Sequence, residues 1–234
     1  MKSKILMILF FIVYSIHAQN GLGTWNVLNF NVKIDSKWSA FVETQLRSLS
    51  FYNEFHYYEY KFGGTYKITD NFSATTGIGS YNTFDEGGNF VTPALNMETR
   101  TWIQGNVKNK IGRVVFENRF RMEQRFTSNG FRNRYRLRLG TIIPLNKKFI
   151  EPKTIYFNMW NELFFTNREP FFERNRLLIG FGYELNKNIG LQAGYIYQFD
   201  YKINDETGRD FLNVAILYSI DLKNKKDYQQ STVD

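Results

Sequence analysis

The chain has 234 residues, no cysteine, and 30 lysines and arginines against 22 acidic residues, which gives a formal net charge of +8. The absence of cysteine excludes a disulfide-stabilised fold and a lipid-bearing cysteine behind an export signal. The length suits one barrel or sandwich domain, and the basic balance would favour nucleic acid as a partner only in an intracellular protein.

The first eighteen residues predict export. Lys2 and Lys4 precede an almost wholly apolar stretch over residues 5–16, and Ala18 provides a small residue at the expected cut. This is the pattern of a secretory signal peptide over residues 1–18. The apolar stretch is too short for a comfortable transmembrane helix, which needs about 20 residues. We therefore expect cleavage after Ala18 and no nucleic-acid partner.

Eleven later segments alternate apolar and polar residues, with no helical period between them. They span residues 25–34, 38–48, 56–68, 72–81, 95–107, 113–126, 131–139, 154–165, 171–185, 189–200 and 210–222. A period of two indicates β-strands, whose successive side chains point to opposite faces. The segments have the length of tilted membrane strands, about nine to eleven residues or more, whereas soluble strands usually have about five or six.

The segment 131–139 shows the alternation most clearly. Arginine occupies positions 132, 134, 136 and 138, and mainly apolar residues occupy the positions between them. Four guanidinium groups in a row are costly to bury in a soluble core without partners. A transmembrane β-barrel accommodates them because its outside is apolar and its inside is polar.

We therefore predict an all-β fold, an antiparallel transmembrane β-barrel over residues 19–222. Because such barrels normally close with an even number of strands, ten or twelve are expected although eleven segments are found. The alternative is a soluble, lipocalin-like barrel with the apolar residues inside and the arginines in water. The strand lengths argue against that alternative.

The connections between the segments are expected to alternate in length. Short periplasmic turns are predicted at residues 35–36, 69–71, 109–112 and 186–188, and outward loops at 82–94, 127–130, 167–170 and 202–209. The linker 144–153 is long on the side expected to be short. The loop 82–94 is the longest and the best candidate for contact with a partner. A polar, disordered periplasmic tail is expected at 223–234.

Several of these segments resemble a known family. They are residues 97–102 (METRTW), 117–126 (ENRFRMEQRF), 131–136 (FRNRYR) and the arginine pair at 174 and 176 followed by GFGY at 180–183. They resemble the Gram-negative family catalogued as domain of unknown function 2490, over nearly the whole mature chain. The resemblance implies an exported protein of the outer-membrane type, with no established reaction, ligand or catalytic residues.

The polar residues at alternate positions of the segments predict a charge network in the lumen. Its arginines are Arg47, Arg100, Arg119, Arg121, Arg125, Arg132, Arg134, Arg136, Arg138, Arg174 and Arg176, and its carboxylates are Glu43, Glu59, Glu98, Glu117, Glu123, Glu162 and Glu184. Guanidinium groups bind carboxylates bidentately, so the network is expected to fill a narrow lumen and tie neighbouring strands together. The excess of arginine leaves open a narrow anion-preferring channel.

Enzymatic chemistry has one candidate, His56, which is the single histidine after the signal peptide. With a serine such as Ser48 or Ser50 it would resemble the pair used by lipid hydrolases and acyltransferases. Its aromatic neighbours favour a place in the interfacial aromatic girdle instead, so no catalytic residue is predicted.

Cofactors and partners follow from the same composition. One histidine and no cysteine predict no metal site, and the acidic stretch 85–89 is read as a turn rather than a calcium site. No cofactor is expected. The expected partners are outer-membrane lipid and small anionic solutes, and the chain is expected to be a monomer.

Overall fold

A computed structural model describes residues 21–128, 130–201 and 206–222. The expected signal peptide, 1–18, and the expected tail, 223–234, lie outside the described residues. The described strands are β1 (Leu22–Lys33), β2 (Trp38–Ser50), β3 (Asn53–Lys67), β4 (Phe72–Asp85), β5 (Val91–Ile111), β6 (Val114–Thr127), β7 (Gly130–Pro144), β8 (Ile155–Thr166), β9 (Phe172–Glu184), β10 (Ile189–Asp200) and β11 (Thr207–Asp221). Within these ranges no helix has the length and apolarity needed to cross a membrane.

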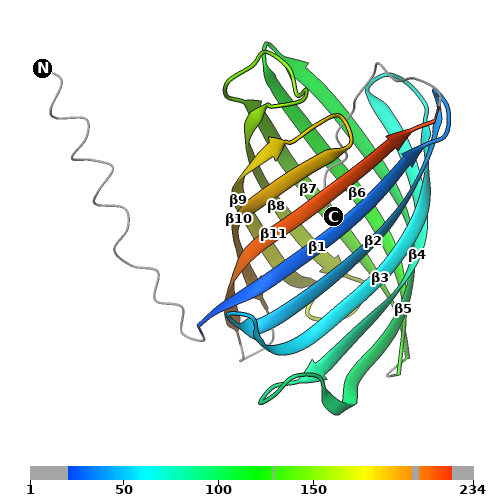
Figure 1. Ribbon diagram of the computed structural model, residues 1–234. Helices are drawn as coiled ribbons and strands as arrows, with labels where there is room; N and C mark the ends of the chain where they lie inside the picture. The colour runs from blue at the N-terminus through cyan, green and yellow to red at the C-terminus, as the bar shows by residue number, and fades with distance from the viewer. Residues whose placement is uncertain (1–20, 129, 202–205, 223–234) are drawn as a thin grey trace, which may run out of the picture.

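The strands form one closed β-barrel (Figure 1). Each strand pairs antiparallel with the next, and β1 pairs in parallel with β11 from Leu22↔Asp210 to Lys33↔Asp221. The predicted barrel is confirmed, and its eleven strands correspond to the eleven alternating segments. The expectation of ten or twelve strands rested on antiparallel pairing throughout. The single parallel seam is what allows eleven strands to close.

The odd strand count places the two ends of the barrel sheet at opposite rims (Figure 1). The rim at which β1 begins also carries the ends of β2, β4, β6, β8 and β10 and the starts of β3, β5, β7, β9 and β11. We call this rim the N-rim. The other rim, where β11 ends, carries 34–37, 68–71, 112–113, 145–154 and 185–188. We call it the C-rim.

The predicted alternation of short turns and long loops is wrong. β4 continues to Asp85 and β5 begins at Val91, and these two residues pair after a shift of register. Only residues 86–90 of the expected loop 82–94 therefore remain outside the strands. Stacking and edge contacts among Phe55, Phe84 and Phe90, with ring centroids 5.3–6.1 Å apart, hold this extended hairpin against β3. The longest described connection is 145–154, at the C-rim.

The two faces of the barrel wall differ in polarity. Apolar side chains point outward, among them Val42, Phe62, Ile103 and Leu139, each more than half exposed. Charged and polar side chains point inward and are buried. The alternative barrel with arginines on the outside is therefore wrong, because strand parity places the guanidinium groups in the lumen.

One side of the lumen is apolar. Its inward residues come from β1, β8, β9, β10 and β11 and form a buried cluster of Trp25, Val27, Trp160, Leu178, Ile196, Phe211, Ala215 and Leu217. The charged side chains of β2 to β8 face this cluster across the barrel. Side chains from both sides therefore fill the middle of the lumen, as expected for a narrow barrel.

Candidate functional site: a cationic cavity above a closed layer

The lumen contains two separate cavities. The larger, of about 750 Å³, is lined by N-rim residues, and the smaller, of about 230 Å³, is lined by C-rim residues. No described residue lines both. The barrel interior is therefore divided across its middle, and we call the two spaces the large cavity and the small cavity.

A charged layer lies between the cavities. Arg136 of β7 is its central cation: Nη1 donates to Glu123 Oε1 at 2.6 Å, and Nε and Nη2 donate to the two oxygens of Glu162, each at 3.0 Å. Arg119 Nη2 also reaches Glu162 Oε1, at 2.5 Å, and Arg121 Nε donates to Gln104 at 2.7 Å. We call Arg119, Arg121, Glu123, Arg136 and Glu162 the closing layer.

The closing layer is dry and nearly balanced in charge. Arg121 and Glu123 have no exposed surface, and Arg119 and Glu162 have almost none. Aromatic rings cover two of its guanidinium groups: Arg121 lies 5.0 Å from the Trp102 ring centroid, and Arg136 lies 4.6 Å from that of Phe164. Bidentate contacts of this kind are the geometry in which a buried guanidinium is compensated. The closing layer therefore consists of buried side chains joined by ion pairs.

In the large cavity, cationic side chains outnumber acidic ones. Its described lining includes ten arginines and one lysine, but only four glutamates and one aspartate. The cations are Arg47, Lys61, Arg100, Arg125, Arg132, Arg134, Arg136, Arg168, Arg174, Arg176 and Arg209, and the anions are Glu59, Glu98, Glu169, Glu173 and Asp200. Clustered charge of one sign in a cleft with low-dielectric walls attracts ions of the other sign. The large cavity therefore has an excess of positive charge.

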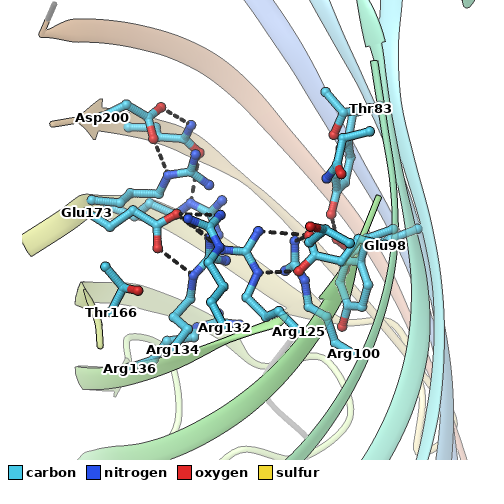
Figure 2. A pocket seen from close by; sticks show the side chains of 18 of the residues that line it. Thr83, Glu98, Arg100, Arg125, Arg132, Arg134, Arg136, Thr166, Glu173 and Asp200 are labelled. Atoms are coloured by element: carbon cyan, nitrogen blue, oxygen red, sulfur yellow. Dashed lines mark hydrogen bonds and ion pairs between the residues drawn. The ribbon is translucent and has the colours of Figure 1, made fainter. Parts of the chain in front are cut away.

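Three arginines of this cavity share Glu173 (Figure 2). Arg134 donates to it twice, at 2.7 and 2.5 Å, while Arg125 and Arg132 approach it at 3.2 and 3.3 Å. Figure 2 shows Arg125 extending from Glu173 toward Glu98, which Arg100 also binds at 2.8 Å. Two carboxylates thus order four arginines.

Sequence analysis missed Glu173. Alternation from Arg174 and Arg176 places residue 173 on the outward face, but β8 and β9 change register: Phe164 pairs with Arg174, and Phe165 then pairs with Phe172. Glu173 is the extra residue of this β-bulge, and a bulge redirects a side chain. The sequence contains no periodic signal for it.

Another arginine cluster comes from β2 and β9, beside the Trp25 ring of β1. The Arg47 guanidinium lies 3.4 Å from the Trp25 ring centroid and donates to Glu59 at 3.2 Å. Arg174 pairs with Asp200. Arg176 lies 4.8 Å from the Trp25 ring centroid and donates through Nε to Gln198 at 2.8 Å. Within the described parts of the chain, Arg176 has no carboxylate partner.

Lys61, which lines the large cavity, also contacts a carboxylate that lines the small cavity. Its Nζ lies 2.7 Å from Glu43 and 3.0 Å from Glu59. Asn29 and Gln45 also donate to Glu43, at 2.8 and 2.6 Å. This arrangement neutralises Lys61 and leaves the excess of positive charge with the arginines above it.

The small cavity is edged by exposed ion pairs. Lys108 lies 2.5 Å from Glu117, and Lys67 lies 2.7 Å from Asp70 in the turn after β3. The hydrogen bond from Lys67 holds the pKa of the Asp70 carboxyl below its usual range. Such exposed pairs contribute little to stability.

The structure places all eighteen predicted network residues toward the lumen. They are buried except for Glu117, Arg132 and Arg174, which are half-buried. Three groups result: the closing layer, the arginines ordered by Glu98 and Glu173, and the Arg47, Arg174 and Arg176 side. Glu117 and Arg138 lie apart from these groups: Arg138 lines the small cavity, and Glu117 pairs with Lys108, which lines it too.

His56 has no serine partner among the described residues. Its ring lies 6.4 Å from that of Tyr57 between centroids, and its buried Nδ1 has no hydrogen-bond partner among the described residues. Ser48 bonds with Thr24 at 2.5 Å, and Ser50 donates to Glu54 at 2.8 Å. The described ranges also contain no cluster of three metal-ligating side chains.

Comparison with known proteins gives one match. The model of the family described as "Protein of unknown function (DUF2490)" matches residues 22–209. No curated protein matches the chain, and no solved structure matches it.

Proposed function

The chain belongs to the DUF2490 family of proteins of unknown function, and from its geometry we propose an outer-membrane β-barrel that is closed in the middle. It acts as a structural or binding protein of a Gram-negative outer membrane, not as a channel or an enzyme. The observation that carries this proposal is the closing layer, which separates the two cavities.

The outer surface supports the membrane location. Apolar side chains dominate it, and the strands have 12 to 21 residues, ample for a tilted crossing. One outward polar pair is satisfied within the wall: the amides of Asn161 and Asn175 bind each other at 3.2 and 3.1 Å and also bind backbone carbonyls. Such internal pairing is what a hydrocarbon environment requires of polar groups. The predicted signal peptide supports export.

The closed wall supports a monomer. Every strand, including β1 and β11, is paired on both sides within one chain, so the sheet offers no edge to a second copy. The barrel requires no partner subunit to satisfy its backbone.

A narrow anion-preferring channel is the second candidate, because the large cavity is cationic. Passage would require the buried ion pairs of Arg136 with Glu123 and Glu162 to separate. Breaking such pairs leaves uncompensated buried charges, which is strongly unfavourable. The closed form is therefore favoured. A lipid hydrolase using His56 has less support, because the neighbouring serines are bonded elsewhere.

Fractionation tests the membrane assignment. We expect the mature protein in the outer-membrane fraction, with heat-modifiable migration on a gel. Recovery as a soluble periplasmic protein would overturn it. Planar bilayers test the closed lumen: we expect no conductance in potassium chloride or potassium phosphate, and stable single-channel steps would favour the channel.

Single cysteines test the orientation, since the chain has none of its own. Ser128 and Ser36 are exposed serines at the N-rim and the C-rim. We propose that the N-rim, whose residues line the large cavity, faces outward. A membrane-impermeant maleimide should then label Ser128→Cys in intact cells, and Ser36→Cys only after permeabilisation. The reverse pattern would invert the orientation.

A further inference from the structure

We propose that the large cavity is a binding site for a small soluble polyanion carrying at least two phosphate or carboxylate groups. The inference rests on the closed lumen proposed above, because the closing layer turns the cavity into a blind pocket. Its volume of about 750 Å³ lies in the range of small-molecule sites.

The charge of the lining selects an anion. Its cations outnumber its carboxylates by about two to one among the described residues, and Glu98 and Glu173 are already engaged by several arginines each. An excess of several positive charges in a recessed space is best matched by a ligand with several negative charges. A single monovalent anion would leave most of the excess uncompensated.

Arg176 identifies where the ligand binds. It is buried, lines the cavity, and uses Nε for Gln198, but no described carboxylate forms an ion pair with it. Its guanidinium shares the Trp25 ring with that of Arg47, at 4.8 and 3.4 Å from the ring centroid. Two guanidinium groups on one indole present a fixed, paired donor surface. Planar forks of this kind recognise phosphate and carboxylate groups.

A buried hydroxyl supports the same site from another wall. Tyr81 is 3% exposed, lines the cavity, and stacks with Arg100 at 3.8 Å. Its hydroxyl has no hydrogen-bond partner among the described residues. Buried polar atoms normally have partners, and an unsatisfied one in a binding cavity is an available donor.

The closed barrel wall restricts the ligand to a molecule that arrives from water. The barrel wall is hydrogen-bonded at every seam, including β1 with β11, so a membrane lipid has no lateral opening into the lumen. The ligand therefore enters from water at the N-rim.

Isothermal titration calorimetry on the folded barrel in a non-ionic detergent tests the proposal. The probes are pyrophosphate, citrate and inorganic phosphate. We expect saturable one-to-one binding of pyrophosphate, citrate or both, and binding of inorganic phosphate at least tenfold weaker. Pyrophosphate alone would identify a phosphorylated ligand and citrate alone a polycarboxylate. Absence of binding by both, or equal affinity for inorganic phosphate, would overturn the proposal.

Matched variants locate the site. Arg176→Gln should weaken binding at least tenfold, because it removes a charged hydrogen-bond donor. Arg113→Gln removes the same charge at the exposed C-rim turn and should leave affinity within twofold. Equal affinity of both variants would overturn the site. Heat-modifiable migration checks folding; if Arg176→Gln does not fold, Arg132→Gln, whose side chain is 35% exposed, replaces it with the same expected weakening.

These outcomes separate the two proposals. Binding in detergent does not depend on conductance, so a barrel that conducts but binds pyrophosphate at Arg176 refutes only the closed lumen. A non-conducting barrel that binds none of the polyanions refutes only the binding site.

Discussion

The closing layer and the large cavity are made of the same residue types, arginine and glutamate at inward positions of neighbouring strands. They differ in the balance between positive and negative charge. In the closing layer, Arg136 is held by two carboxylates and all its neighbours are buried. In the large cavity, Glu173 is shared by three arginines, and Arg176 has no described carboxylate. Compensated charges hold a wall together, whereas uncompensated charges in a recess are available to a ligand.

The largest expected effect is in the closing layer. Glu162→Gln removes a carboxylate bound by Arg119 and Arg136 and leaves buried cations without compensation. We expect the free energy of unfolding to fall by about 3–5 kcal/mol. Urea titration followed by the heat-modifiable gel shift measures it. Glu86→Gln breaks an exposed pair with Arg209 and should cost less than about 1 kcal/mol. Similar losses for both variants would remove the distinction between the regions.

Glu173→Gln makes the corresponding change in the large cavity. Because the side chain is partly exposed, at 17%, we expect a loss of about 1–3 kcal/mol from its charged hydrogen bonds. Pyrophosphate should bind more tightly, since the variant frees three arginines. The same urea titration and calorimetry measure both quantities. Weaker pyrophosphate binding in a folded variant would show that Glu173 orders the site rather than competing with the ligand.

Arg176→Gln should change stability least among the buried charge variants. It loses the hydrogen bond to Gln198, worth about 1 kcal/mol, but it also removes a buried cation that lacks a described carboxylate. We expect the free energy of unfolding to stay within about 1 kcal/mol of the wild type. Arg136→Gln is the matched control and should cost several times more. A large loss for Arg176→Gln would reassign it to the structural network.

Added salt should have the smallest effect on stability, but its effect should differ between the closing layer and the large cavity. From about 0.1 to 1 M salt the Debye length falls from about 10 to 3 Å, but screening acts mainly on charges in contact with solvent. Pyrophosphate affinity should decrease, while the stability difference between wild type and Glu162→Gln should stay constant within about 0.5 kcal/mol. A stability difference that shrinks with salt would show that solvent enters the closing layer.

Local alternation predicted much of this fold. Because strand side chains alternate between faces, the sequence was enough to place Arg132, Arg134, Arg136 and Arg138 on one face and Leu137 and Leu139 on the other. It did not place Glu173, because a bulge depends on how β8 and β9 register against each other. It also misjudged residues 82–94, where aromatic contacts extend β4 and β5 beyond the alternating segments.

The sequence by itself determined the eleven alternating segments, the face of most side chains and the excess of arginine in the lumen, since all three are set by residue type and a period of two. Only the tertiary structure decided the parallel closure of β1 on β11, the partners of each arginine and the division of the lumen. Those features depend on which strands meet across the barrel, through pairings between residues far apart in the chain. Arg136 and Arg176 look alike in sequence, and their surroundings in the folded barrel give them different partners.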